Sequence, residues 1–254
     1  MPHMEKKIDG RDLHMFAVCH MLASMDGKID GAFFGMPKTA PALKAYTDLR
    51  EGYRCQATLY GMTTMLEGYA DGKLSKRPAA AQALPKEDWV NPEGRAMGNF
   101  IVSMDPKGEL AFSSHVLEKK GRPAAHVIQA LTQQVSPEYL SYLKKHGVSY
   151  LIAGKERMDC AQLLLKLGTC FGIDRLMIAG GGVTNWSFLQ EGLIDEVSLV
   201  VAPVVEGSTT AVSLFERAGF LPPHAPVALS ILEAKTLEGD TLWLRYVSKG
   251  TVSS

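Results

Sequence analysis

Two kinds of hydrophobic periodicity alternate along the chain, and together they predict an α/β fold. Short, almost wholly apolar runs occur at 14–23, 176–179 and 197–202, as is typical of strands that are covered on both faces. Residues 42–53 instead place apolar side chains at three- and four-residue steps, which predicts an amphipathic helix. Strand and helix patterns alternate through the second half, which favours a largely parallel sheet.

Helix-end signals define two helices of the second half. Ser136 followed by Pro137 predicts a helix start, and Gly147 predicts its end. Asp159 is expected to cap the next helix, with Gln162 three residues later as in a capping box. Further strands are expected at 57–61, 100–102, 126–128, 149–154 and 175–179, with a short helix that stops at Gly192.

Two segments depart from this alternation. Residues 68–97 are interrupted repeatedly by glycine and proline, which predicts a surface excursion with little regular structure that would suit a lid. Residues 227–236 and 241–247 flank a turn and predict a C-terminal antiparallel hairpin. Because no linker or internal repeat divides the chain, we expect one domain over 1–254, with a core at about 14–247 and tails at 1–13 and 248–254.

The amino-acid composition limits the kinds of molecule that the protein is expected to bind. The 27 basic residues balance the 27 acidic ones, which argues against a nucleic acid or an acidic membrane surface and favours a small ligand. No apolar run reaches the roughly 18 residues of a membrane span, and the start lacks a signal peptide, so we expect a cytoplasmic protein. The four cysteines and seven histidines show no metal-site spacing, so no metal is expected.

The turn Gly180-Gly181-Gly182 lies where a strand passes into a helix. Glycines there let a ligand approach the backbone, and a helix N-terminus attracts phosphate. Thr184 or Asn185 would cap that helix or donate to a phosphate oxygen. The alternative is a tight turn that needs positive φ. The pattern matches neither the Rossmann fingerprint nor the P-loop.

Two further turns follow predicted strands. The segment 24–28 offers the hydroxyl of Ser24 and the carboxylate of Asp26, and its lysine in the third ligand position argues against a calcium loop. Gly61 and Thr64 follow the strand 57–61, where a threonine would cap a helix or donate to phosphate. Each turn alone would also suit a purely structural role. Three such turns at one sheet edge predict a cleft for an extended, phosphate-bearing cofactor.

In this order, these segments resemble the reductase domain of riboflavin biosynthesis. The resemblance spans about 14–247 and rests on S-M-D-G-K-I at 24–29, Y-G-M-T-T at 60–64, F-L-Q-E-G-L-I-D-E at 188–196 and A-P-V-V-E-G at 202–207. It implies the dihydrofolate-reductase-like fold, an α/β architecture with a central, mostly parallel mixed sheet flanked by helices and a C-terminal antiparallel hairpin.

The resemblance also implies an activity. NADPH would donate a hydride to C1′ of the opened sugar imine of a diaminopyrimidinone or aminouracil ribosylamino 5′-phosphate. By position, Asp26 becomes the candidate for orienting the substrate or relaying a proton, and family members usually form homodimers, with Asp195 and Glu196 near the contact. The implied cofactor-binding residues are Leu22 and Ser24 along the nicotinamide, Gly61 and Thr64, and Gly180, Gly181, Gly182, Val183, Thr184 and Asn185 around the diphosphate.

Departures from the family pattern leave the substrate open. Ala179 stands where these reductases usually have a glutamate, and Lys38, Arg50 and Arg54 are available for a substrate phosphate without a clear match. One alternative is therefore a reductase of another pterin or pyrimidine, such as dihydrofolate. The other is a non-catalytic nucleotide-binding protein of the same fold.

Two other features have both a structural and a functional reading. The basic run 119–122 would reach the 2′-phosphate of NADPH or would be a solvated charge run. His20, on a strand, is interpreted as a hydrogen-bonded sheet histidine rather than a catalyst. The four cysteines are interpreted as small buried apolar residues.

Overall fold

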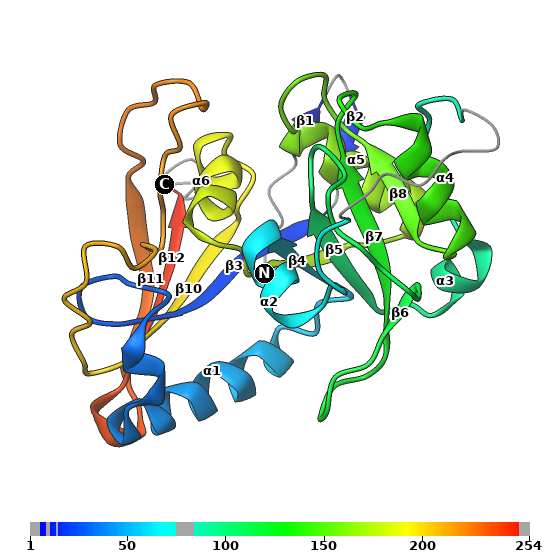
Figure 1. Cartoon of the computed structure of the whole chain (residues 1–254). Helices are drawn as coiled ribbons and strands as arrows, with labels where there is room; N and C mark the ends of the chain where they lie inside the picture. Colours follow the sequence, from blue (N-terminus) through cyan, green and yellow to red (C-terminus); the bar gives the residue numbers. More distant parts are fainter. Residues whose placement is uncertain (1–5, 9–10, 14, 75–83, 249–254) are drawn as a thin grey trace. The chain divides into compact units, whose positions relative to one another are not determined.

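The computed structural model describes residues 6–8, 11–13, 15–74 and 84–248 (Figure 1). The described residues fall into two compact units. Unit 1 comprises 16–55 and the described residues from 175 onward, and unit 2 comprises 56–174 together with the described residues before 16. Among the described residues, no helix is both long and apolar enough to cross a membrane.

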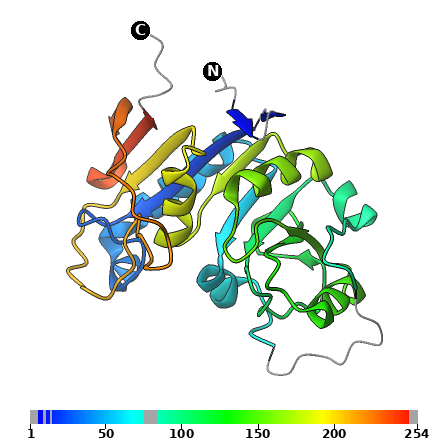
Figure 2. The same ribbon diagram turned by 90° about the horizontal axis from the view of Figure 1, so that it is seen from above.

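Unit 1 contains a mixed sheet in the order β11-β12-β10-β3-β9. The strand β3 pairs in parallel with β10 on one side and with β9 on the other. The C-terminal hairpin pairs antiparallel with β10, and Figure 2 shows it at the margin of the sheet. The strands are β3 (Phe16–Ala23), β9 (Arg175–Ile178), β10 (Glu196–Val201), β11 (Leu229–Thr236) and β12 (Leu242–Ser248).

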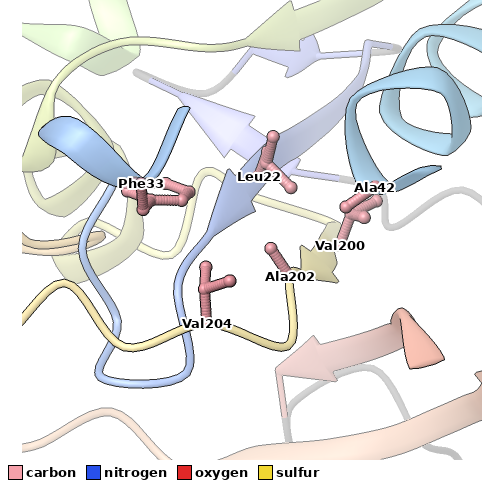
Figure 3. Close-up of a cluster of buried hydrophobic side chains, with 6 residues drawn as sticks. All are labelled: Leu22, Phe33, Ala42, Val200, Ala202 and Val204. Atoms are coloured by element: carbon pink, nitrogen blue, oxygen red, sulfur yellow. The ribbon is translucent and has the colours of Figure 1, made fainter. Parts of the chain in front are cut away.

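The unit 1 core lies between this sheet and α1 (Ala40–Gly52) (Figure 1). Two short 3₁₀ helices, η1 (Ala32–Gly35) and η2 (Pro37–Thr39), lead into α1. Figure 3 shows side chains from β3, η1, α1 and the end of β10 meeting in one cluster, formed by Leu22, Phe33, Ala42, Val200, Ala202 and Val204. Burying each larger apolar side chain in it contributes about 1.5–3 kcal/mol.

All eight residues of β3 are buried, which explains why its sequence is almost continuously apolar.

The helix α6 (Gly182–Gln190) follows β9 and buries Phe188 and Leu189. It ends two residues before Gly192, which adopts the positive φ of 67° expected of a helix-terminating glycine.

Unit 2 has four parallel strands in the order β4-β5-β7-β8, with β6 antiparallel to β7. Its helices are α2 (Met62–Gly68), α3 (Pro92–Ala96), α4 (Pro137–Lys145) and α5 (Cys160–Phe171). Its strands are β4 (Ala57–Gly61), β5 (Phe100–Met104), β6 (Val116–Leu117), β7 (Ala125–Leu131), β8 (Ser149–Ile152) and the antiparallel pair β1 (Lys6–Ile8) and β2 (Arg11–Leu13). The predicted α/β class, with a mostly parallel sheet and a C-terminal hairpin, is therefore confirmed.

The helix caps follow the sequence signals closely. Ser136 accepts the N–H of Tyr139 at 3.3 Å, and Asp159 accepts the N–H of Gln162 at 2.8 Å. Only half of the expected capping box forms. The side-chain oxygen of Gln162 accepts the N–H of Gly154, at 3.0 Å, instead of the N–H of Asp159. It thereby links the end of the β8 segment to α5.

The expected excursion at 68–97 is only partly irregular. Residues 75–83 lie outside the described residues, whereas 84–97 pack onto unit 2. Trp89 exchanges two backbone hydrogen bonds with Tyr150, and Asp88 accepts the N–H of Ile152 and pairs with Lys166. Their partners lie about 60–80 residues later in the chain, which local composition does not reveal. A mobile lid over 84–97 is therefore not supported.

The N-terminal segment also differs from the expected tail. Residues 6–8 and 11–13 form the β1–β2 pair, and both strands pack near α5. The remaining residues of 1–13 and those after 248 lie outside the described part of the chain.

Candidate active site

The carboxyl ends of β10, β3 and β9 lie at one edge of the unit 1 sheet, because these three strands are parallel neighbours. Ligands of α/β sheets bind at this edge. The loops that leave it are 24–31 after β3, 179–182 after β9 and 202–207 after β10. This edge therefore brings together most of the predicted site residues, and the others, Gly61 and Thr64, belong to unit 2.

The N-terminus of α6 has the features of an anion site. Gly181 is the N-cap residue, and no side chain caps the helix. The N–H groups of Gly182, Val183 and Thr184 occupy the first turn, where no intrahelical acceptor exists. A Cβ atom added to Gly181 would find no atom within 4 Å, so a ligand can approach this backbone closely.

The three glycines are needed for packing and access rather than for positive φ. None of them is among the residues with positive φ, so the tight-turn interpretation is wrong. A Cβ on Gly182 would overlap the carbonyl oxygen of Ser213, and one on Gly180 would lie 2.6 Å from the Cβ of Thr184. Close packing thus explains why positions 180 and 182 are glycine, whereas a Cβ atom at position 181 would meet no neighbouring atom within 4 Å.

Thr184 and Asn185 do not cap α6, contrary to one reading of the sequence. Both side chains are buried, because they face the interior from the first turns of the helix. The Asn185 amide donates to the carbonyl of Leu214 at 2.9 Å, and its oxygen has no hydrogen-bond partner among the described residues. Asn185 therefore holds the 213–216 segment against α6, and Val183 is half-buried.

Leu22 belongs to the core cluster shown in Figure 3. Its side chain is 4% exposed and lies in the same cluster as Phe33 and Val204. The side chain thus packs into the core, and the expected place of Leu22 along the nicotinamide stays a prediction. The alternation of side chains along β3 places Leu22 and His20 on the same face, toward α1.

Ser24 and Asp26 form a closed hydrogen-bonded turn. The Ser24 hydroxyl donates to Asp26 Oδ1 at 2.6 Å and accepts the N–H of Lys28 at 3.0 Å. Asp26 Oδ1 and Oδ2 also accept the N–H groups of Glu206, at 3.0 Å, and Gly207, at 2.9 Å. The hydrogen bond from Ser24 and those two backbone donors hold the pKa of Asp26 well below its usual range.

These contacts favour an orienting role for Asp26. Both of its oxygens accept hydrogen bonds, and its lowered pKa makes it a weak proton acceptor. A catalytic role for Asp26 stays a prediction, and the geometry does not favour proton transfer.

Lys28 links the loop after β3 to a segment near α6. Its ammonium group donates to the carbonyl of Ala211 at 3.1 Å and to the hydroxyl of Ser213 at 3.0 Å. Glu216 then donates its N–H to the carbonyl of Gly182 at 3.0 Å. No sequence pattern indicates this connection, since its partners are more than 180 residues from Lys28.

In unit 2, Gly61 ends β4 and is the N-cap residue of α2, and Thr64 is half-buried in the first turn of that helix. No side chain caps α2, so Thr64 does not have the capping role that the sequence allowed. Their expected role toward a cofactor stays a prediction.

The basic run 119–122 is not simply solvated. Tyr60 and Tyr69 stack with ring centroids 4.9 Å apart, and Arg122 donates to both of their hydroxyls, at 3.1 and 3.0 Å. Lys119 lies 5.0 Å from the centroid of the Tyr69 ring, at cation–π distance. A role of this run toward the 2′-phosphate of NADPH stays a prediction.

Other polar residues that the sequence singled out have hydrogen-bond or ion-pair partners within unit 1. Lys38 pairs with Asp240, and His20 is buried and hydrogen-bonded, as interpreted from the sequence. Asp195 accepts the N–H of Ala17 at 2.7 Å. Among the described residues, no three His, Cys, Asp or Glu side chains gather as a metal site would require.

Glu196 belongs to a buried ion-pair network. It receives two hydrogen bonds from the Arg245 guanidinium, at 2.7 and 2.8 Å, and one from the Tyr53 hydroxyl. Its side chain is 2% exposed. Glu196 therefore stabilises the pairing of β10 with β12 inside unit 1, a role that the sequence did not indicate.

Comparisons with known proteins agree with these observations. The family model described as the RibD C-terminal domain matches residues 16–243. The curated 2,5-diamino-6-ribosylamino-4(3H)-pyrimidinone 5′-phosphate reductase of Methanothermobacter thermautotrophicus is 26% identical over 239 residues, which cover 92% of this chain and 99% of that protein.

Solved structures share the fold. A pyrimidine reductase-like protein from Corynebacterium diphtheriae superposes with a TM-score of 0.63 at 16% identity, over 94% of this chain and 93% of that one. RibD of Acinetobacter baumannii gives a TM-score of 0.60 at 21% identity over 92% of this chain. This chain spans 58% of that longer protein.

Proposed function

Because the chain belongs to the RibD C-terminal domain family, we propose that it is an NADPH-dependent reductase of riboflavin biosynthesis that acts on a ribosylaminopyrimidine 5′-phosphate. One observation carries this proposal: the similarity to the archaeal pyrimidinone phosphate reductase extends over nearly the whole of both chains. The arrangement of the unit 1 edge supports it, since two family motifs and the α6 N-terminus meet there.

The residues at this edge fit a dinucleotide phosphate. The backbone at Gly181 is open, and the amides of Gly182, Val183 and Thr184 would hold the diphosphate. This arrangement needs few cations, in keeping with the neutral overall charge. Ser24 lies at the same edge, and Gly61 and Thr64, in unit 2, remain proposed cofactor-binding residues. NADPH would supply the hydride.

The protein contributes chiefly positioning. Hydride transfer relies on the cofactor's own chemistry and on the orientation of the reactants. Asp26 remains ionised and holds two backbone amides, so it orients a loop rather than exchanging a proton. We therefore expect no single side chain of unit 1 to be indispensable for the chemical step.

Two measurements test the proposal. Titration of the protein with NADPH, followed by cofactor fluorescence, should saturate in the micromolar range. NADPH oxidation should then depend on the ribosylaminopyrimidinone 5′-phosphate. Absence of saturable binding would contradict the reductase assignment, and binding without turnover of any substrate would favour a non-catalytic nucleotide-binding protein.

Ala179 provides the reason to assay a second substrate class. It follows β9 directly and is 7% exposed, so the edge lacks the carboxylate that the family resemblance associates with substrate. Dihydrofolate should be tested in parallel under the same conditions. Turnover of dihydrofolate alone would assign the chain to a pterin reductase instead.

We further propose a homodimer formed through the C-terminal hairpin. Ile231 is 59% exposed and Leu242 is 41% exposed, and both lie on the face of the hairpin that carries Tyr246. The Ile231→Glu variant should sediment as a monomer, whereas the wild-type protein should sediment as a dimer. A monomeric wild-type protein would contradict this assembly.

The family model spans both units, so we propose that the whole chain acts as a single reductase domain. We also propose that it works in the cytoplasm on small molecules, without a nucleic-acid or membrane partner. The balanced charge supports the part of this proposal that concerns nucleic acids and acidic membrane surfaces.

A further inference from the structure

Two loops at the candidate active-site edge hold each other through exchanged hydrogen bonds. The loop after β3 provides the carboxylate of Asp26, which accepts the N–H groups of Glu206 and Gly207 in the loop after β10. The loop after β10 returns a carboxylate, because Glu206 Oε2 accepts the N–H of Phe33 at 2.8 Å. The loop after β3 thus places an acid on the backbone of the loop after β10, which in turn places an acid on the backbone of η1, directly after the first loop.

The fit around the Glu206 carboxylate is tight. Gly31 has a φ of 126°, and a Cβ atom there would overlap the Glu206 carboxyl group. Glycine at position 31 therefore allows the carboxylate to reach the amide of Phe33. Phe33 is 1% exposed and belongs to the cluster of Figure 3, so the contact anchors the loop to the core.

The two loops carry exposed apolar side chains at the ligand edge. Met25 is 67% exposed and Val205 is 65% exposed, and the N–H of Met25 donates to the carbonyl of Val204 at 2.8 Å. A planar ring of a ligand entering at this edge would meet such side chains. Their position depends on how firmly the two loops are held together.

We propose that Glu206 is a positioning residue that forms, with Asp26, a reciprocal clamp between the segments 24–33 and 204–207. The clamp fixes the two loops that leave adjacent parallel strands, β3 and β10, and so sets the shape of the ligand edge. Its consequence for catalysis rests on the proposed reductase function, whereas the clamp itself is a property of the free protein.

Amide hydrogen exchange in the ligand-free protein tests the clamp directly. A hydrogen bond to a charged acceptor contributes enough that its loss should speed exchange by about tenfold. Glu206→Ala should speed exchange of the Phe33 amide, and also of the amides at positions 206 and 207, because the clamp is reciprocal. Asp26→Ala should likewise speed exchange of the Phe33 amide. Effects confined to the amides bonded by the mutated residue would overturn the proposal.

Three further variants keep the test decisive. Glu206→Gln retains an acceptor oxygen and should leave the amide of Phe33 protected. Gly31→Ala should reproduce the exchange pattern of Glu206→Ala, since its methyl group displaces the carboxylate. The two changes combined should be less than additive, because they break one contact. Glu51→Ala, an exposed acid on α1, serves as the control and should alter none of these amides.

Steady-state kinetics test whether the clamp affects substrate binding at the candidate active site. Glu206→Ala should raise KM by about tenfold and change kcat by less than about twofold, because it disturbs positioning and no reacting group. Glu206→Gln should restore most of the loss. If the wild-type protein has no reductase activity, the proposed function fails, and the exchange experiment still decides the clamp. A kinetic profile of Glu206→Ala equal to that of Glu51→Ala would overturn the positioning role.

Discussion

His20 Nδ1 lies 2.9 Å from the hydroxyl of Ser198 on the neighbouring parallel strand. The other ring nitrogen, Nε2, is 2.9 Å from the carbonyl of Tyr46, which can only accept. Nε2 therefore carries the hydrogen, and Nδ1 accepts the Ser198 O–H. The Ser198 oxygen in turn accepts the indole N–H of Trp243 at 2.9 Å. This network fixes a neutral ring in one tautomer.

This arrangement predicts that acid destabilises unit 1. Burial lowers the pKa of His20 from 6.5 to about 4. Between these values the unfolded chain binds the proton and the folded chain does not, so the free energy of unfolding rises with pH across that window and falls on acidification. The contribution is about 1.4 kcal/mol per pH unit. Urea unfolding at pH 4.5, 5.5 and 7 measures it.

His20→Gln separates this effect from other titrations. The variant should be less stable at pH 7, and its stability should depend less on pH between 4 and 6.5. His126 in unit 2 also has a pKa lowered to about 4 by burial, so part of the pH dependence should persist. A slope unchanged by His20→Gln would contradict the neutral, buried state of this histidine.

Neighbouring glycines of the β9–α6 turn should respond oppositely to substitution. Gly182→Ala places a methyl group against the Ser213 carbonyl and should lower the free energy of unfolding by about 1–3 kcal/mol. The Cβ of Gly181→Leu meets no atom within 4 Å, so this change should cost less, at most about 1 kcal/mol, since leucine is a poorer N-cap residue than glycine. The same Gly181→Leu variant should weaken NADPH binding by at least about tenfold, because it blocks access to the first-turn amides.

Thermal unfolding and NADPH titration of both variants provide the comparison. A stable Gly181→Leu protein that binds NADPH normally would remove the α6 N-terminus from the cofactor site. A Gly182→Ala protein as stable as the wild type would show that the 213–216 segment can shift away from α6.

The sequence predicted local features well, because local chemistry determines them. The caps at Ser136 and Asp159 need only residues within one turn, and the buried strand β3 is evident from its own composition. His20 was also interpreted correctly, since a lone histidine in an apolar strand usually has hydrogen-bond partners within the sheet.

Contacts between distant segments could not be predicted in this way. The bond between Asp26 and the amide of Glu206 joins positions 180 residues apart, so no spacing in the sequence encodes it. Leu22 illustrates the same limit. Its motif implies a place along the nicotinamide, but the motif does not reveal that the side chain packs in a cluster with residues of η1 and α1.

The ion pair between Glu196 and Arg245 should contribute strongly to stability. Both groups are largely buried, with 2% and 13% of their side chains exposed, and two hydrogen bonds join them. Glu196→Gln leaves a guanidinium without its main counter-charge and should cost about 3 kcal/mol of unfolding free energy. Asp48→Ala breaks the exposed pair with Lys44, which solvent screens, and should leave the free energy of unfolding almost unchanged.

Chemical denaturation at low and high salt distinguishes the two pairs. The effect of Asp48→Ala should vanish at 1 M salt, where the screening length is about 3 Å, and that of Glu196→Gln should largely persist. Equal costs for both variants would show that the Glu196 network adds no stability beyond that of a surface pair.

Gly94 and Gly68 offer a matched test of packing in unit 2. A Cβ on Gly94 in α3 would overlap the buried imidazole of His126, whose Nε2 is 2.7 Å from the hydroxyl of Ser149. Gly94→Ala should therefore displace the ring and cost at least about 2 kcal/mol. Gly68→Ala, at the end of α2, meets no atom within 4 Å and should be neutral or stabilising by up to about 0.5 kcal/mol. Urea unfolding at pH 7 measures both changes, and a Gly94→Ala protein as stable as Gly68→Ala would show that α3 is not packed against His126.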